Sequence, residues 1–76
     1  MTHVIQFREA FARKIIKLRK DKDKTQEEIA AAINIKRARY AAYEERRSEP
    51  PISVLRRLAA FYGMTLDQLT NVETTA

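Results

Sequence analysis

The stretch TQEEIAAAINIKRARYAAYE, residues 25–44, predicts two short helices joined by a tight turn. Thr25 and Glu28 have the spacing of a capping box, in which each side chain hydrogen-bonds to the backbone amide of the other residue at the start of a helix. Asn34 interrupts the apolar pattern, and asparagine tolerates the left-handed backbone conformation that a sharp turn requires. The stretch is therefore typical of a helix-turn-helix unit.

The two helices of this unit differ in what they are expected to expose. In the first helix, Ile29, Ala30 and Ile33 fall on one face, and Ala30 is small enough to allow the helices to cross closely. In the second helix, Tyr40 and Tyr43 are expected to turn inward, because tyrosines at helical spacing are more often core residues than platforms for stacked bases. Lysine and arginine remain among small alanines, which predicts a basic outer face.

The composition of the whole chain favours one small helical domain. Its 76 residues suffice for a single core, and one glycine, two adjacent prolines and frequent Ala, Glu, Lys and Arg favour helices over strands. The chain has no cysteine and shows no cluster of metal-ligand residues, so we expect neither disulfides nor a cofactor. No apolar run approaches the roughly 20 residues of a membrane span and the N-terminus lacks the pattern of a signal peptide, so we expect a soluble intracellular protein.

The formal net charge of +5 is concentrated in one part of the chain. Residues 8–24 hold eight lysines or arginines against three acidic residues, whereas the segment from Thr65 onward holds two acidic residues and no basic one. A one-sided basic surface is typical of proteins that bind polyanions, most often nucleic acid. A solvated charged face would have the same composition, so the charge alone leaves both interpretations open.

Apolar spacing predicts three more helices around the helix-turn-helix unit. The first precedes a charged loop at residues 20–24 and is amphipathic, since its apolar residues recur every three or four positions. The second spans about residues 52–62, after two prolines, and Gly63 suits its left-handed cap. The third is a short helix over residues 65–69, capped by Thr65.

The chain is therefore expected to fold as an all-α, five-helix bundle in a single domain. This domain spans residues 1–76, with a core at about 7–70 and flexible ends. Whether the first six residues extend the first helix is left open. Outside the helix-turn-helix unit, the expected core residues are Phe7, Phe11, Ile15, Leu18, Val54, Leu55, Leu58, Phe61, Leu66 and Leu69.

Residues 11–69 resemble the five-helix DNA-binding domain of the lambdoid phage repressor and Cro family, also called the xenobiotic-response-element-like family. The matching segments are FARKIIKLRK, TQEEIAAAI, YEERRSEP and LRRLAAFYGMTLDQL. The family usually has glycine where Asn34 and Arg46 stand, and Ser or Thr where Lys36 stands. We therefore expect the second helix of the unit to lack a side-chain cap, at a cost of ~1 kcal/mol, and Arg46 to affect the loop that follows.

The resemblance implies sequence-specific binding to double-stranded DNA, with the second helix of the unit in the major groove. Base readout is assigned to Arg37, Ala38 and Ala42, because arginine can donate two hydrogen bonds to guanine and alanine can contact a thymine methyl. Arg37, like each lysine and arginine assigned to phosphates below, could alternatively be a free surface cation. Phosphate contacts are assigned to Thr25, Gln26, Lys36, Arg39, Arg46 and Arg47.

Two further assignments follow from the resemblance. Arg19 and Glu44 match positions that pair inside the family's fold and join its first helix to the end of its third. Family members bind palindromic operators as dimers with recognition helices ~34 Å apart, so we expect a homodimer. The dimer contact is expected away from the basic faces, at Met64, Leu66, Leu69 and Val72.

The leading hypothesis is a small transcriptional regulator of the repressor type. The resemblance implies that such a protein is cytoplasmic and nucleoid-associated, in a bacterium or phage. The alternative is an antitoxin or anti-repressor that uses the same fold mainly to hold a partner protein such as a toxin, which would require a large exposed apolar patch. An enzyme is the weakest class, because the sequence has no cysteine, no glycine-rich phosphate loop and no clustered carboxylates. His3, the only histidine, lies close to the N-terminus and is given no catalytic role.

Overall fold

A computed structural model of the chain describes the backbone of residues 3–72 and the side chains of residues 7–72. No strand occurs in this part of the chain. The all-α, five-helix architecture expected from the sequence is confirmed. The helices are α1 (His3–Asp21), α2 (Gln26–Ala32), α3 (Arg37–Glu44), α4 (Ile52–Tyr62) and α5 (Leu66–Thr70).

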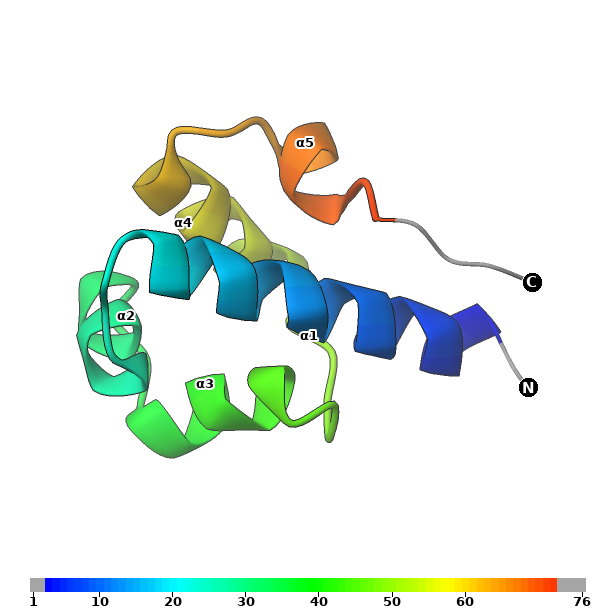
Figure 1. The fold of residues 1–76 in the computed structure, drawn as a ribbon, viewed down its shortest axis with the longest axis horizontal. Helices are drawn as coiled ribbons and strands as arrows, with labels where there is room; N and C mark the ends of the chain where they lie inside the picture. The colour runs from blue at the N-terminus through cyan, green and yellow to red at the C-terminus, as the bar shows by residue number, and fades with distance from the viewer. Residues whose placement is uncertain (1–2, 73–76) are drawn as a thin grey trace.

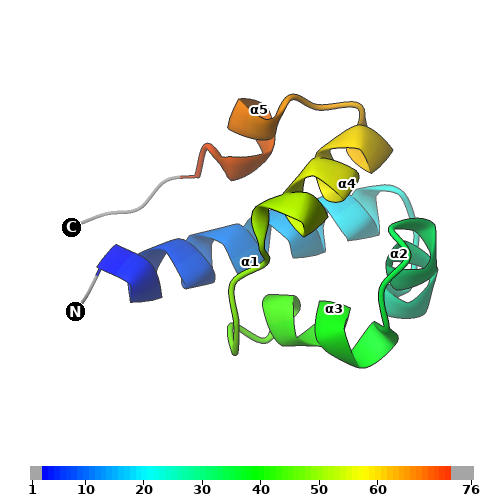
Figure 2. The same cartoon turned by 180° about the vertical axis from the view of Figure 1, so that it is seen from behind.

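The longest helix, α1, lies across the middle of the molecule. In both views α3 and α5 lie on opposite sides of α1 (Figure 1, Figure 2). The closest packing between helices is that of α2 with α3, of α4 with α5, and of α1 with α3. The helix-turn-helix unit, α2 and α3, therefore packs against α1 through α3. α3 borders the molecule on the side away from α5 (Figure 1, Figure 2).

The first helix begins earlier than its apolar residues indicate. The periodic pattern starts at Phe7, but α1 starts at His3, since no proline or glycine interrupts the chain before Phe7. The rings of Phe7 and Phe11 stack with centroids 5.5 Å apart. Residues 3–6 thus extend the helix, while the expected flexibility of residues 1–2 and 73–76 concerns positions outside the described residues.

The capping box at the start of α2 is confirmed. The Thr25 hydroxyl accepts a hydrogen bond from the Glu28 amide at 3.1 Å, and the Glu28 carboxylate accepts one from the Thr25 amide at 2.9 Å. Asn34 has the expected left-handed backbone, with φ 60°. Lys36, at the N-cap of α3, makes no side-chain capping bond, as expected. The capping box therefore sets where α2 begins, and the turn at Asn34 separates α2 from α3.

The core takes buried side chains from all five helices. The expected inward direction of both tyrosines of α3 is confirmed, and Tyr40 is among the largest fully buried residues. The buried cluster comprises Phe11, Ile15, Ile29, Ala30, Ile33, Tyr40, Tyr43, Val54, Leu58, Ala59 and Leu69. Partly buried residues that pack against this cluster include Phe7, Leu18, Ile35, Leu55, Phe61, Met64 and Val72.

Leu69 corrects one expectation about the surface. It is 0 % exposed and belongs to the core, which confirms its expected inward position and shows that it is not a surface residue available to a partner protomer. Met64, Leu66 and Val72, the other residues expected at the dimer contact, are partly buried and keep some exposed surface. Because α5 has five residues, fewer than two turns, its apolar pattern does not define which side faces inward.

The short helix α5 is held by contacts at both ends. Thr65 and Gln68 form a second capping box at its start. At its other end, the Lys14 ammonium of α1 donates hydrogen bonds to the carbonyl oxygens of Gln68 and Asn71. Gly63, with φ 66°, forms the expected left-handed cap of α4 just before this segment.

Arg46 follows α3 in a strained conformation. Its φ is 64°, in the left-handed region that glycine adopts freely and that costs other residues roughly 1–2 kcal/mol. A non-glycine residue at this position therefore introduces backbone strain into the loop that follows α3.

Replacing Arg46 with glycine is expected to raise the free energy of unfolding by about 0.5–1 kcal/mol, since relief of the strain exceeds the extra freedom of glycine in the unfolded chain. Thermal unfolding followed by circular dichroism would show this as a Tm higher by roughly 2–8 °C. Arg46→Ala removes the same side chain and keeps the strain, so it is the matched control. Equal stability of the glycine and alanine variants would contradict the strain.

Candidate nucleic-acid interface

The recognition end of α3 is exposed and basic. Residues 36–39 are all exposed, whereas residues 40–44 are all buried, so the helix leaves the core toward its N-terminus. Lys36, Arg37 and Arg39 project cations from this end, with Ala38 between them. Within the described residues, none of the three forms an ion pair. Their charges are therefore available to an external anion.

Ala42 lies apart from this surface. It is 8 % exposed and is buried together with Ala41, because the C-terminal half of α3 rests on the core. A buried methyl group has little surface for a base in the major groove, which argues against the expected contact. Arg37 and Ala38 remain as exposed candidates for base readout.

A shallow concavity joins the start of α2 to the start of α3. It brings Thr25 and Gln26, two expected phosphate contacts, next to Arg37, the expected base-reading residue. Three basic side chains and one acidic side chain line the concavity. It lies at the N-terminus of α2, the end at which the first backbone N–H groups of a helix point outward. The arrangement suits a phosphate group. The lining residues are Arg19, Lys24, Thr25, Gln26, Glu27 and Arg37.

A second pair of arginines follows the other end of α3. Arg46 and Arg47 are both exposed. The Arg47 guanidinium pairs with the Glu45 carboxylate at 2.8 Å, while Arg46 forms no ion pair with any described residue. Of the two expected phosphate contacts, Arg46 is thus the one whose charge is not already neutralised.

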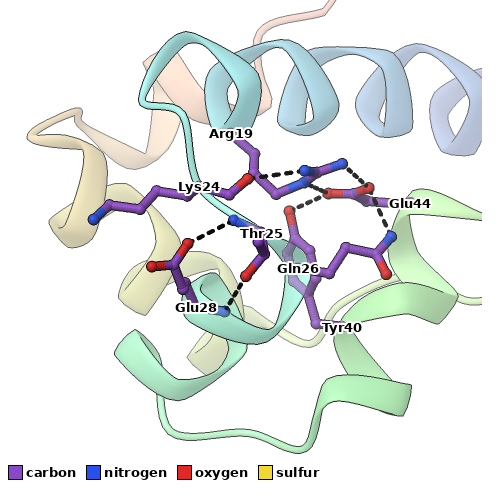
Figure 3. Close-up of polar contacts among 7 residues, drawn as sticks. All are labelled: Arg19, Lys24, Thr25, Gln26, Glu28, Tyr40 and Glu44. Atoms are coloured by element: carbon purple, nitrogen blue, oxygen red, sulfur yellow. Dashed lines mark hydrogen bonds and ion pairs between the residues drawn. The ribbon is translucent and has the colours of Figure 1, made fainter.

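The carboxylate of Glu44 lies at the centre of a polar network (Figure 3) that includes Arg19 and Gln26, two residues that line the concavity. Arg19 pairs with it through two hydrogen bonds, of 2.7 and 3.0 Å, which confirms the expected ion pair. Gln26 donates a third bond at 3.0 Å, and the Tyr40 hydroxyl donates a fourth at 2.5 Å. Arg19 also donates to the carbonyl oxygen of Lys24 at 3.0 Å. One carboxylate therefore connects α1, α2 and α3.

Burial and hydrogen bonding set the charge states in this network. Burial by itself would raise the pKa of Glu44, but hydrogen bonds from Arg19, Gln26 and Tyr40 outweigh it, so the pKa of Glu44 lies below its usual value. The hydrogen bond to Glu44 raises the pKa of Arg19. Burial, followed by the bond to Glu44, raises the pKa of Tyr40 well above that of an exposed phenol. At neutral pH the network is a carboxylate, a guanidinium and a neutral phenol.

Two of these interactions have weak signals in the sequence. Tyr40 precedes Glu44 by four positions, a spacing that places both side chains on one helical face. Lys24, which lines the concavity, directly precedes the Thr25 cap. A lysine next to a predicted helix start is the sequence feature that could have identified it as a site residue. The bond from Gln26 to Glu44 has no such signal, because the two residues lie 18 positions apart on different helices.

The described residues also answer two general questions. In that part of the chain no helix is long and apolar enough to cross a membrane. No group of three or more His, Cys, Asp or Glu residues within it is placed to hold a metal ion.

Comparisons with known proteins identify relatives of the helix-turn-helix unit and of the core around it. The sequence model of a family described as helix-turn-helix matches residues 15–69, which contain all of the unit and most of the core. The transcriptional repressor RstR of the cryptic phage CTXphi, from Vibrio cholerae, is 36 % identical over 61 residues, covering 80 % of this chain and 55 % of the repressor. The chain thus spans about half the length of that relative. No solved structure matches the chain significantly. With α3 exposed beside the start of α2 and the family match across both helices, this chain belongs to the Cro/C1-type helix-turn-helix family of DNA-binding, non-enzymatic domains.

Proposed function

We propose that this chain binds double-stranded DNA in a sequence-specific manner and represses transcription. The observation that carries the proposal is the exposed, unpaired basic end of α3 beside the concavity at the start of α2. The relative from Vibrio cholerae is a transcriptional repressor by name, which supports repression as the use of this binding. A protein with this function acts where bacterial or phage DNA lies, in the cytoplasm.

In this proposal the N-terminal end of α3 enters the major groove. Arg37 donates two hydrogen bonds to O6 and N7 of a guanine, and the Ala38 methyl touches a thymine methyl. Lys36 and Arg39 contact phosphates on either side and position the helix without reading sequence. The remaining phosphate contacts are Thr25, Gln26, Arg46 and Arg47.

We also propose that two copies pair on a palindromic operator. One α3 exposes its first three residues and its N-cap Lys36, which is little contact for a regulator, whereas two helices ~34 Å apart read both half-sites. The segment from Thr65 onward carries no basic residue and is poorly suited to face phosphates. The partly buried Met64, Leu66 and Val72 are therefore the proposed contact.

The alternative of an antitoxin or anti-repressor requires an apolar surface for a partner protein. Among the described residues, Ile52, which is 54 % exposed, is the one large apolar side chain in the exposed class. Apart from the partly buried residues proposed for the dimer contact, this single isoleucine forms no patch, so the described surface favours DNA over a partner protein.

Binding of duplex DNA should weaken steeply with salt. If the two protomers together use 6–10 phosphate contacts, affinity is expected to fall roughly 10³–10⁵-fold between 50 and 200 mM salt. Fluorescence-anisotropy titration of duplexes selected from a random pool measures both the affinity and the slope. A folded protein that binds no duplex at low salt would end the proposal.

Arg37→Ala should relax the base preference at one position of each half-site, costing ~1–3 kcal/mol there. Gln26→Ala should instead weaken binding to all sequences alike, since a phosphate contact reads no base. Competition between matched and single-mismatch duplexes separates the two effects. Arg13→Ala, which removes an exposed cation of α1, is the charge-matched control for Arg37→Ala. An unchanged preference in Arg37→Ala would show that another residue reads the base.

A further inference from the structure

Glu44 has no surface with which to touch DNA, yet it binds a residue that does line the concavity. Its side chain is 4 % exposed. Its carboxylate accepts a hydrogen bond from the Gln26 amide at 3.0 Å, and Gln26 lines the concavity beside Thr25 and Arg37. The buried carboxylate is therefore one hydrogen bond away from the proposed DNA surface.

The bond to Glu44 uses part of the Gln26 amide and fixes the rest. A glutamine amide has two N–H donors, so one remains to meet a phosphate while the other is held by Glu44. A free glutamine side chain rotates about several bonds, and ordering such a side chain on binding lowers affinity. In this structure the Gln26 side chain makes its bond to Glu44 in the absence of DNA (Figure 3).

The same carboxylate also steadies the chain just before α2. Arg19, which pairs with Glu44, donates a third hydrogen bond to the Lys24 carbonyl at 3.0 Å, and Lys24 precedes the Thr25 cap. Glu44 is itself the last residue of α3. The start of α2 is thus connected on two sides to the recognition helix.

We propose that Glu44 is a positioning residue for DNA binding, acting through Gln26: it holds the Gln26 amide in place for a phosphate while α3 lies in the major groove. This role rests on the proposed function, because it concerns the affinity of the same site. It differs from a purely structural role, in which the network would affect folding and leave the affinity of the folded protein unchanged.

A double-mutant cycle on duplex affinity tests the coupling. Glu44→Asp keeps the negative charge for Arg19 but shortens the side chain by one methylene, which separates it from Gln26. We expect Glu44→Asp to weaken binding roughly 2- to 10-fold, and Gln26→Ala to weaken it at least as much. Because the first effect acts through Gln26, the double variant should bind no more weakly than Gln26→Ala alone. Losses that multiply, or an unchanged affinity in either single variant, would overturn the proposal.

Tyr40→Phe is the matched control. It removes a hydrogen bond to Oε2 of the same carboxylate, whereas Gln26 keeps its bond to Oε1 and Arg19 still holds both oxygens. Tyr40 is 0 % exposed and has no surface of its own for DNA. We expect Tyr40→Phe to lower the urea midpoint of unfolding. Its duplex affinity should stay within about 2-fold of wild type, less than the loss of roughly 2- to 10-fold expected for Glu44→Asp. A loss of affinity equal to that of Glu44→Asp would assign the effect to stability of the fold and overturn the proposal.

NMR relaxation of the wild-type protein gives an independent measurement that requires no folded Glu44 variant. The side-chain amide of Gln26 should have an order parameter near the ~0.85 of rigid backbone in the absence of DNA, and a value below about 0.6 would overturn the proposal. Because this measurement uses no DNA, its failure concerns Glu44 and Gln26 alone. Wild-type protein that binds no duplex would instead contradict the proposed function.

Discussion

Leu69→Glu is expected to lower the free energy of unfolding by more than about 4 kcal/mol, because it places an unpaired carboxylate in the core. Leu69 is 0 % exposed and belongs to the buried cluster with Val54 and Leu58. Small domains are stable by only about 5–15 kcal/mol, so most of the stability should be lost. Urea unfolding followed by circular dichroism measures the loss.

Leu66→Glu is the matched control, and it also tests the dimer. Leu66 is partly exposed and begins α5, where an acidic residue is favourable at a helix start, so the fold should persist. If the proposed dimer contact is correct, this variant should bind a palindromic duplex with weaker pairing, seen as one-to-one complexes in sedimentation. Near wild-type stability of Leu69→Glu would contradict the core position, and unaffected pairing in Leu66→Glu would contradict the contact.

Glu44→Ala is expected to lower the free energy of unfolding by about 3–5 kcal/mol, because it leaves Arg19 without its partner in a largely buried site. It also removes the acceptor of Gln26 and Tyr40. Glu45→Ala is the matched control: the neighbouring glutamate is exposed and pairs only with exposed Arg47 among the described residues, so about 0–1 kcal/mol is expected. Urea titrations of the two variants test the difference, and similar losses would show that burial of the pair contributes little.

The pH dependence of stability should depend on the same residue. The folded-state pKa of Glu44 is lowered, so its contribution is fully present above the unfolded-state carboxyl pKa of ~4.3 and is lost as pH falls through the lower folded value. Wild-type protein should therefore lose stability on acidification below about pH 5 more steeply than Glu44→Ala. Parallel pH profiles of the two proteins would contradict this assignment.

Interactions between residues close in sequence could be predicted from the sequence. The capping box of Thr25 and Glu28 joins residues three positions apart, so its geometry depends on one helical turn and on nothing else in the fold. The left-handed conformations of Asn34 and Gly63 are likewise local properties of the residue and the turn. The resemblance to the family came from four segments that match it in register, and the family match over residues 15–69 confirms it.

The pairing of Arg19 with Glu44 was inferred from the resemblance, and the structure confirms it. The sequence did not distinguish the two neighbouring glutamates: Glu44 is buried among four hydrogen bonds and Glu45 is exposed. One step along a helix turns a side chain by about 100°, and only the position of α1 and α2 decides which of the two directions is occupied.

The sequence by itself determined the five helices, the caps at Thr25, Thr65 and Gly63, and the charge. The tertiary structure decided that α1 starts at His3, that Leu69 belongs to the core and not to the dimer contact, that Ala42 is buried and that Gln26 turns toward Glu44. The reason is physical: local hydrogen bonds depend on residue type and spacing, whereas burial and contacts between helices depend on crossing angles that many side chains set together. A helix of five residues, or one that leaves the core partway along its length, has a pattern too short to reveal those angles.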